Sequence, residues 1–340
     1  MGSMNKLSPI SPGERAPDFV LPVLSGAPTR FYARAGGAPT VLVFTPDTNE
    51  KVRSFIESLQ RLANAPDTFI VQSSPEPEGA THTPFTDKEG EVRRAYRMGD
   101  PDQIVGLLLS PNLRIISTHT LCDPARDVEQ IARTLASRPQ PEPREISAIA
   151  PVLLIPDVLT PDICQALVRV WQDQGNEETG IEQSVGQHRE NIIDHTHKKR
   201  RDHVVVDEKL MRLISTTVGR RVMPELKKAF HFEATRFEGF KIVCYDSAEH
   251  GFFHAHRDNL SPATAHRRFA LTLNLNAGYE RGHLTFPEYG PHLYKPNAGG
   301  AILFSSSHLH EVTPVTKGKR FALLSFLFGD NDIRATPPTF

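Results

Sequence analysis

The run Lys319-Arg-Phe-Ala-Leu-Leu-Ser-Phe-Leu-Phe328 is an apolar stretch that begins with two cationic side chains. Its aliphatic and aromatic content predicts a buried β-strand. An arginine at the start of such a strand is costly to bury unless its charge is met. A guanidinium group binds carboxylates through two parallel hydrogen bonds. Arg320 is therefore a candidate for binding an acidic ligand inside a β-structure, with a solvent-reaching or protein-paired arginine as the alternative.

A set of candidate metal ligands precedes this strand. His310 lies ten residues before Arg320 and follows the strand-like run Gly299-Gly-Ala-Ile-Leu-Phe304, and a second motif reads His254-Ala-His-Arg-Asp258. Residues i and i+2 of a strand share a face, so His256 and Asp258 are predicted to reach one ion, with His310 as the third ligand. Two histidines and one carboxylate on one side of a metal form the facial triad of non-haem Fe(II) oxygenases, which leaves positions open for other ligands.

Two other ligand sets are compatible with the same residues. His254 and His256 form an H-x-H pair, and His308 has the same strand parity as His310. The ten-residue offset between His310 and Arg320 favours the set His256, Asp258 and His310. A zinc or other non-redox metal protein could use the same three ligands, although it would leave Arg320 unexplained.

The elements around these residues predict the fold of the second half. Thr160 is a candidate N-cap for a helix that begins at Pro161, and a second helix is expected over Glu208 to Phe230. Strands are expected at Phe237 to Tyr245, Arg268 to Asn276, Gly300 to Phe304 and Arg320 to Phe328. Helices followed by many strands indicate a β-sandwich or barrel buttressed by helices.

Together these segments resemble the 2-oxoglutarate/Fe(II) dioxygenase superfamily over roughly residues 150–330. The resemblance lies in 245–259, 268–276, 282–289 and 299–328, and is strongest to the prolyl 4-hydroxylase-like branch, which includes bacterial PKHD-type hydroxylases. It implies a double-stranded β-helix, or jelly roll. It also implies His256, Asp258 and His310 as iron ligands and Arg320 as the 2-oxoglutarate ligand. Tyr245, Thr272 and Asn274 are further candidates for the co-substrate pocket.

The resemblance implies a chemistry as well. Fe(II), 2-oxoglutarate and O₂ would hydroxylate an unactivated C–H bond with release of succinate and CO₂, with ascorbate as a candidate reductant. The substrate class would be a prolyl or other amino-acid, peptidyl or small-metabolite substrate. Because Asp258 keeps the carboxylate ligand, hydroxylation is favoured over halogenation. A degenerate two-domain protein that only binds partners is the rival from another functional class.

Several charged residues and histidines outside the predicted metal ligands have more than one interpretation. The chain has Arg281-Gly-His-Leu284 where the family usually has Gly-Gly-Glu-Leu, so His283 is either a pocket residue or a solvent-facing histidine. The segment 186–203 contains a basic run, His195 to His203. That run is interpreted as a solvated loop or as the basic rim of a substrate lid. Arg267 and Arg268 are expected to face substrate or solvent.

The first half alternates strand-like and helix-like runs. Strands are expected at 40–45, 68–72 and 104–110, an apolar helical stripe includes Val52 and Leu59, and a closing helix is expected at 127–135. This alternation predicts an α/β fold. The alternating prolines of 137–144 predict an extended linker between the two halves.

Residues 12–137 resemble peroxiredoxins and related thioredoxin-fold proteins. The resemblance lies in Pro12 to Pro22, Thr86 to Tyr96 and the hairpin from Leu107 to Thr118. Peroxiredoxin chemistry needs a thiolate at a helix N-terminus, but Arg53 occupies the position of that cysteine. The domain is therefore expected to be thiol-inactive, with a role in docking a partner or a second protomer. Weak redox activity of Cys122, itself expected to be a small buried residue, is the alternative.

These patterns divide the chain into a tag and disordered N-terminus at 1–11, the thioredoxin-like domain at 12–137, a linker at 138–146, the dioxygenase domain at 147–332 and a tail at 333–340. The 340 residues include 39 Lys plus Arg and 40 Asp plus Glu, a balance that argues against nucleic-acid binding. No apolar run is long enough to span a membrane. Three widely spaced cysteines are typical of a reducing, cytoplasmic setting.

Overall fold

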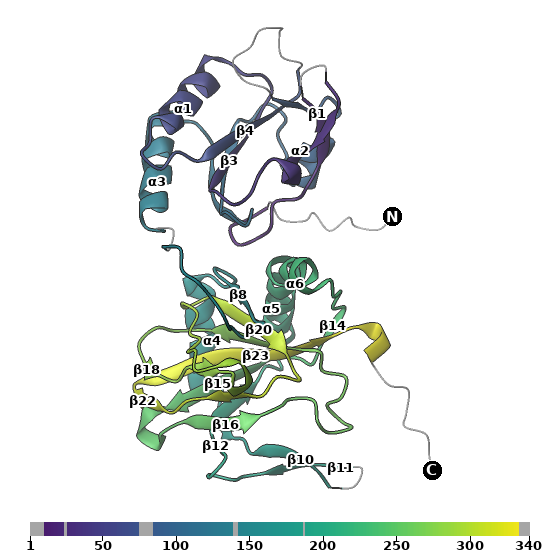
Figure 1. The fold of residues 1–340 in the computed structure, drawn as a ribbon, viewed down its shortest axis with the longest axis vertical. Helices are drawn as coiled ribbons and strands as arrows, with labels where there is room; N and C mark the ends of the chain where they lie inside the picture. Colours follow the sequence, from purple (N-terminus) through teal and green to yellow (C-terminus); the bar gives the residue numbers. More distant parts are fainter. Residues whose placement is uncertain (1–9, 24–25, 75–83, 139–141, 186–187, 333–340) are drawn as a thin grey trace. The chain divides into compact units, whose positions relative to one another are not determined.

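The chain divides into two compact units. A computed structural model describes residues 10–23, 26–74, 84–138, 142–185 and 188–332, and its two units are Met1–Pro143 and Arg144–Phe340 (Figure 1). Most of the predicted N-terminal tag, three linker residues and the predicted tail at 333–340 lie outside the described residues. Among the described residues, no helix has both the length and the apolar character that crossing a membrane requires.

The N-terminal unit is built on a five-stranded mixed sheet in the order β5-β4-β3-β6-β7. Its strands are β3 (Thr40–Thr45), β4 (Asp67–Gln72), β5 (Phe85–Thr86), β6 (Val105–Leu109) and β7 (Ile115–His119), with a separate pair β1 (Val20–Pro22) and β2 (Pro28–Arg30). Its helices are α1 (Glu50–Gln60), α2 (Glu91–Ala95), α3 (Pro124–Ala136) and the short 3₁₀ helix η1 (Phe31–Ala33).

The connectivity of this sheet is that of a thioredoxin fold. The β3-α1-β4 segment supplies a parallel pair, β6 and β7 form an antiparallel hairpin, and α3 follows. The apolar stripe that predicted α1 is buried with α3 on one face of the sheet, and a second core that includes Phe31 and Tyr96 covers the other face. The predicted α/β class is confirmed, whereas the closer likeness to peroxiredoxins stays a prediction.

Two expectations about this unit concern thiol chemistry. Arg53 is exposed on α1, at the position where the peroxiredoxin pattern has its cysteine. Cys122 is also exposed, so the expectation of a small buried residue was wrong. It lies in the connection between β7 and α3, where the chain turns at the surface before Asp123 caps the helix.

The C-terminal unit contains two facing antiparallel sheets. The larger has the order β8-β20-β17-β23-β15-β13-β9, with β14 also paired to β23. Its strands are β8 (Leu153–Ile155), β9 (Glu177–Glu178), β13 (Arg201–Val204), β14 (Arg236–Phe237), β15 (Lys241–Asp246), β17 (Phe269–Asn274), β20 (Ala301–Ser305) and β23 (Lys319–Phe328). The smaller sheet has the order β12-β16-β21-β19, with strands β12 (Lys198–Lys199), β16 (Phe252–His256), β19 (Leu284–Thr285) and β21 (His310–Val312).

Two further strand pairs and several helices complete this unit. Two further strand pairs are β10 (Ile181–Val185) with β11 (His188–Ile192), and β18 (Glu280–Arg281) with β22 (Val315–Lys317). The helices are α4 (Pro161–Asp173), α5 (Glu208–Arg221) and α6 (Met223–Phe230), with 3₁₀ helices η2 (Ser247–Glu249), η3 (Pro287–Tyr289) and η4 (Asp330–Asp332).

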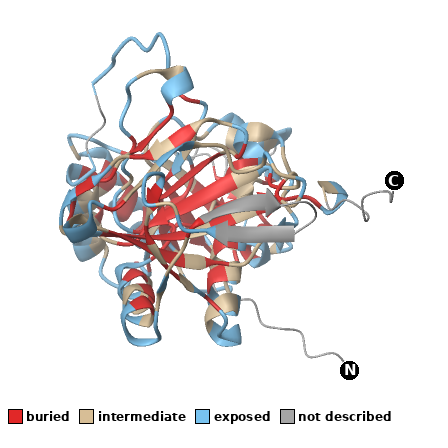
Figure 2. Cartoon of the chain, turned by 90° about the horizontal axis from the view of Figure 1, so that it is seen from below, coloured by how far each residue is buried: buried red, intermediate tan, exposed pale blue. Residues whose placement is uncertain are grey.

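Two cores lie on opposite faces of the large sheet. On one face, α4, α5 and α6 pack against side chains such as Leu271 and Leu323. On the other face, Val243, Ala322 and Phe304 pack against residues of the small sheet such as Val312. Figure 2 shows buried positions along the strands. The predicted jelly-roll sandwich with buttressing helices is confirmed, and its interior lies between the two sheets.

The helical part of the unit differs from the prediction in one place. Thr160 caps α4 as expected, since its hydroxyl accepts a hydrogen bond from the backbone N–H of Ile163 at 3.4 Å. The single helix expected over Glu208 to Phe230 is instead two helices that separate at Val222. Pro224 explains the break, because proline lacks the N–H of a helix interior and its ring clashes with the preceding turn.

Candidate metal centre

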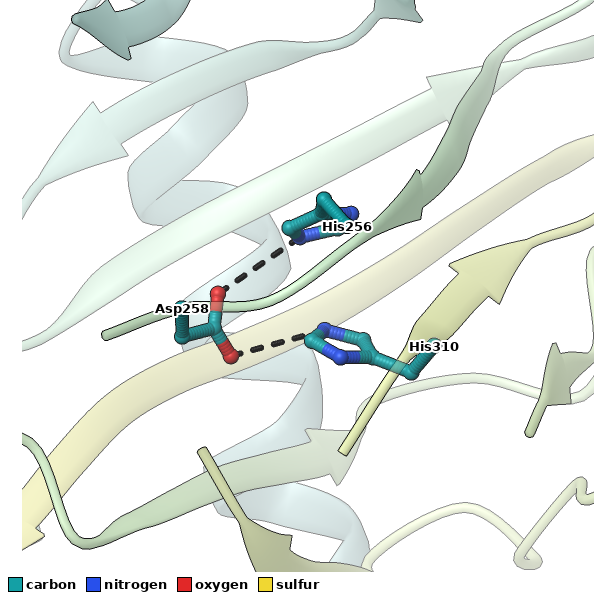
Figure 3. Close-up of side chains that lie close together, drawn as sticks. All are labelled: His256, Asp258 and His310. Atoms are coloured by element: carbon teal, nitrogen blue, oxygen red, sulfur yellow. Dashed lines mark ion pairs between the residues drawn. The ribbon is translucent and has the colours of Figure 1, made fainter. Parts of the chain in front are cut away.

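Two segments that lie far apart in the sequence bring three side chains together. His256, Asp258 and His310 each offer a ligand atom, and these atoms all lie within 4.8 Å of one another. The Nε2 atom of His256 is 3.5 Å from Oδ1 of Asp258, and Nε2 of His310 is 3.4 Å from Oδ2 of the same carboxylate (Figure 3). Two nitrogens and one carboxylate facing a common point are the donor set of a 2-His-1-carboxylate centre.

The strands of the small sheet bring these residues together. His256 ends β16, His310 begins β21, and the two are direct partners in the antiparallel register. Asp258 lies beyond the end of β16, so the expected strand geometry for the i, i+2 pair was wrong. Its backbone is held from two sides instead, because its N–H donates to Ser306 and its carbonyl accepts from Arg267 at 3.2 Å.

The imidazoles are oriented by backbone carbonyls. Nδ1 of His256 is 2.8 Å from the carbonyl oxygen of His254, and Nδ1 of His310 is 3.0 Å from that of His308. A hydrogen on Nδ1 makes this bond and leaves Nε2 as the lone-pair donor, which is how proteins usually present histidine to a metal. The ring of Phe253 also stacks on His256, with centroids 3.6 Å apart.

Burial and charge favour the protonation states that a metal requires. Burial lowers the pKa of His310, so its neutral form is favoured, although Asp258 partly opposes this shift. Burial alone raises the pKa of Asp258, but the attraction of His310, His256 and Arg267 outweighs it and leaves the pKa below its usual range. A neutral imidazole beside an ionised carboxylate is the combination that ligates divalent cations.

The two alternative histidines lie outside this cluster. His254 is exposed, and its ring packs against Phe252 with centroids 4.5 Å apart. His308 places its Nδ1 3.1 Å from the hydroxyl of Tyr289. Among the described residues, only His256, Asp258 and His310 form a group with metal-ligand spacing.

Arg320 lies inside the sandwich with part of its hydrogen-bonding capacity unused. The residue is 3% exposed, and its Nε and Nη1 atoms are buried without a hydrogen-bond partner in the part of the chain that the structure describes. Leaving a buried donor unpaired costs about 1–3 kcal/mol, and more for a charged group. Two unpaired donors on one buried guanidinium leave it able to bind an anionic group such as a ligand carboxylate.

Tyr245 lies directly beside this arginine. The two residues are paired across β15 and β23, and the guanidinium carbon of Arg320 is 5.4 Å from the centre of the Tyr245 ring. On the other side, Arg200 donates a hydrogen bond of 3.3 Å to the Tyr245 hydroxyl. Arg200 is itself held by Asp202 through bonds of 2.7 Å from both Nε and Nη2.

The two remaining pocket candidates differ in what they can offer. Thr272 is buried, and the strand period places it on the same face of β17 as Asn274. The side chain of Asn274 is already engaged, because its amide donates to the carbonyls of Asn276 and Pro296 and its oxygen accepts from Tyr279 at 3.0 Å. Asn274 thereby holds Tyr279, and the nearby Arg320 guanidinium partly offsets the rise in the Tyr279 pKa that burial causes.

Several expectations about charged residues were wrong. Lys198 and Arg200 belong to the basic run that was expected to be a solvated loop or rim, yet both are buried. Arg267, expected to face substrate or solvent, is buried against Glu238 with a contact of 2.7 Å, while exposed Arg268 pairs with Asp332. The other half of the predicted lid includes residues 186–187, which lie outside the described residues.

His283 falls between its two interpretations. It is partly buried rather than fully solvent-facing, and burial together with the nearby cations Lys295, Arg320 and Arg281 lowers its pKa.

The sequence did not single out Tyr279 or the Arg200–Asp202 pair. A signal existed only for the second, since an R-x-D pattern on a strand puts opposite charges on one face.

Comparisons with known proteins agree with this arrangement. The 2OG-Fe(II) oxygenase superfamily matches residues 240–328, which contain all three clustered side chains and Arg320. A PKHD-type hydroxylase of Pseudomonas putida is 30% identical over 173 residues, which is 47% of this chain and 69% of that protein. A PKHD-type hydroxylase of Psychrobacter sp. is 46% identical over 61 residues, or 17% of this chain and only 24% of that protein.

Among solved structures, a prolyl hydroxylase from Trichoplax adhaerens, in complex with a hypoxia inducible factor peptide fragment, is 16% identical. It has a TM-score of 0.43 and covers 53% of this chain and 84% of its own. The family assignment does not depend on this weaker likeness, because the relative from Pseudomonas putida matches over more than two thirds of its length. The chain belongs to the 2OG-Fe(II) oxygenase superfamily, and its C-terminal unit is a 2-oxoglutarate-dependent dioxygenase domain related to the PKHD-type hydroxylases.

Proposed function

We propose that this protein is an Fe(II)- and 2-oxoglutarate-dependent hydroxylase that acts on a prolyl or other amino-acid, peptidyl or small-metabolite C–H bond and releases succinate and CO₂. The proposal rests on one combination of features: a 2-His-1-carboxylate cluster and a buried arginine with two unpaired donors belong to the same sandwich. A structural zinc site would account for the first feature and leave the second unexplained.

The donor set fits ferrous iron. Two imidazole nitrogens and one carboxylate oxygen suit a divalent transition metal, and the carbonyl contacts to both Nδ1 atoms direct Nε2 toward the cluster. His256, Asp258 and His310 would therefore hold the metal. When bound, Fe(II) supplies the one-electron and O₂ chemistry that no side chain provides.

The protein residues have separate tasks toward the co-substrate. Arg320 would bind the distal carboxylate of 2-oxoglutarate with its guanidinium group, whose Nε and Nη1 are unpaired among the described residues. Tyr245 and Tyr279 flank the guanidinium and keep its position fixed, and Asn274 holds Tyr279 in turn. Thr272 lies on the same strand face as Asn274 and is a further wall of this pocket.

A direct test is an anaerobic titration of the full-length protein with Fe(II) and 2-oxoglutarate. A visible metal-to-ligand charge-transfer band that appears only when both are present would report chelation of the co-substrate at the metal. Admission of O₂ should then yield succinate in an iron-dependent manner. Zinc binding without such a band, and no succinate with iron, would favour the non-redox metal protein instead.

The substrate requires a separate experiment. Mass spectrometry of candidate amino acids, peptides and metabolites incubated with the loaded enzyme should detect a product heavier by one oxygen atom. The matched control is the Asp258→Ala protein, which should form no product. Ascorbate can be varied in the same assay, and we expect it to sustain turnover rather than to start it.

A further inference from the structure

A second cluster of reactive side chains lies in the N-terminal unit. Ser117 and His119 are both on β7, and Asp127 is in the first turn of α3. The Oγ atom of Ser117 is 2.8 Å from Nε2 of His119, and Nδ1 of the same ring is 3.1 Å from Oδ1 of Asp127. A hydroxyl, an imidazole and a carboxylate therefore form one continuous chain of hydrogen bonds.

The local fold explains why these residues meet. The strand period places Ser117 and His119 on one face of β7, and the exposed Thr118 between them points the other way. The register of β7 against β6 shifts just before Ser117, which marks a β-bulge. Bulges re-aim side chains and occur often beside active sites.

The hydrogen bonds run from the Ser117 hydroxyl to the His119 imidazole and on to the Asp127 carboxylate, which is the order that activates a serine as a nucleophile. With its hydrogen on Nδ1, the imidazole donates to Asp127 and leaves Nε2 to accept the hydrogen of the Ser117 hydroxyl. The His119 side chain is only 4% exposed and that of Asp127 14%, so water competes little for these bonds. A bridge that merely tied β7 to α3 would need only the contact between His119 and Asp127.

The hydroxyl end of this chain opens on a shallow cavity. Ser117 and His119 line it together with Gln130, Arg133 and Thr134 of α3, and its volume is about 280 Å³. That volume is at or below the lower end of small-molecule sites, roughly 300–1,000 Å³. Each of these five side chains carries a polar group, and Gln130 and Arg133 have N–H donors that suit a carbonyl oxygen, although Arg133 also pairs with Glu129 at 3.3 Å.

We propose that the N-terminal unit carries a serine esterase site for small, short-chain carboxylic esters, with Ser117 as nucleophile, His119 as general base and Asp127 as the residue that positions the imidazole. Ser117 Oγ forms a bond to the acyl carbon while its proton passes to Nε2. The ester C–O bond then breaks, and the alcohol leaves with that proton. A water molecule next attacks the acyl group, His119 takes its proton and returns it to Ser117, and the carboxylic acid departs. No oxidant, metal or cofactor takes part in these steps, which fits a thioredoxin fold without a thiol at Arg53.

The test uses a fluorophosphonate, which reacts with activated serines, on the full-length protein. We expect a single adduct by intact mass, and fragmentation of the tryptic peptide Ile115–Arg126 should place it on Ser117. p-Nitrophenyl acetate hydrolysis should be lost in the labelled protein. No adduct, or an adduct on another residue, would overturn the proposal, and this outcome needs no variant that has to fold.

Variants separate catalysis from structure. Asp127→Asn keeps the shape of the side chain and should slow both labelling and hydrolysis by about 100-fold or more. Ser117→Ala should abolish both, and Thr118→Ala, which removes the neighbouring exposed hydroxyl, should change neither. If Asp127→Asn reacted as fast as the unaltered protein, the imidazole would not be acting as proposed. Iron-dependent succinate formation should be the same in all these variants, so the outcome is independent of the dioxygenase site.

Discussion

Tyr245 and Arg320 are direct partners across β15 and β23, and both side chains face the interior of the sandwich, where Arg200 approaches the tyrosine from its other side. The tyrosine therefore lies between two guanidinium groups, at 5.4 Å from that of Arg320 and 5.8 Å from that of Arg200. Arg200 is neutralised by Asp202, while Arg320 keeps two unpaired donors. This asymmetry assigns the two arginines different tasks: one supports the tyrosine, and the other is available to a ligand.

Replacement of Arg320 tests the second task. Arg320→Ala should raise the Kd for 2-oxoglutarate by about 10- to 100-fold, because a charged hydrogen-bonded contact is worth about 1.5–3 kcal/mol. Isothermal titration of the Co(II)-loaded protein measures this without turnover, and Arg320→Lys should restore part of the affinity. Arg236→Ala, which removes an exposed arginine paired with Asp330, is the matched control and should leave the Kd unchanged. An unaltered Kd in Arg320→Ala would show that the co-substrate binds elsewhere.

The metal ligands can be separated from their histidine neighbours. His310→Ala should weaken Co(II) binding by at least about 100-fold, since even outer-shell losses cost about 10- to 100-fold. His308→Ala should bind normally, because His308 contacts Tyr289 rather than the cluster, although its backbone carbonyl orients His310. The visible d–d spectrum of the Co(II) protein reports both affinity and coordination. Equal losses in the two variants would contradict the assignment of His310.

The sequence was sufficient to predict most helices and strands and the cluster of His256, Asp258 and His310. It was not sufficient to predict the contacts that surround this cluster. Local signals predicted α4, because Thr160 is a typical N-cap residue and Pro161 a typical first helical residue. The long apolar run of β23 likewise predicted a buried strand. The pairing of Tyr245 with Arg320 is a long-range register, which no local pattern encodes. Asp258 was expected on a strand because its spacing from His256 is that of one strand face, but β16 ends at His256, two residues earlier.

Charged residues were the main source of error, for a physical reason. A basic run is usually solvated, yet Lys198 is inside, where its ammonium group donates to Thr179 and to the carbonyl of Gly180 at 2.7 Å. Tyr279 was missed because it lies on no recognisable strand and acts through Asn274 and Arg320. Burial of a charge depends on partners that are distant in the chain, and those partners appear only when the sheets are assembled.

A glycine beside Arg320 offers a test of the pocket wall. Gly282 has a φ of +62°, and a Cβ added there would lie 2.7 Å from Cγ2 of Val315 and 3.3 Å from Cδ of Arg320. We expect Gly282→Ala to lower the free energy of unfolding by about 1–3 kcal/mol, through left-handed strain and overpacking, and to weaken 2-oxoglutarate binding. Gly278→Ala is the control, since nothing lies within 4 Å of its added Cβ. A Gly282→Ala protein with normal binding would show that the stem of Arg320 can move freely.

Removal of one partner of the Arg200–Asp202 pair should be strongly destabilising. Asp202→Asn leaves the buried guanidinium without its counter-charge, and breaking such a pair costs about 3–5 kcal/mol. Urea unfolding followed by tryptophan fluorescence measures this unit alone, because Trp171 is the only tryptophan of the chain and packs on Phe321 in the helix-covered core. A smaller loss in the double variant Arg200→Met/Asp202→Leu would indicate that the pair matters for position more than for stability.

The Arg200–Asp202 pair also predicts how the difference in unfolding free energy between the unaltered protein and Asp202→Asn depends on pH. Burial alone raises the pKa of Asp202, but Arg200, assisted by Lys198 and Thr179, outweighs it and leaves the pKa below that of an unfolded aspartate, about 3.9. A carboxyl group with a depressed folded pKa stabilises the fold above the unfolded pKa, and the contribution disappears as the pH falls through the folded value. The gap in unfolding free energy between the unaltered protein and Asp202→Asn should therefore be constant from neutral pH down to about pH 5. It should then shrink as the solution becomes more acidic. Urea titrations of both proteins at a series of pH values, read by Trp171 fluorescence, give this gap directly. A gap that stayed constant into strong acid would mean that Asp202 contributes by shape and hydrogen bonding rather than by its charge.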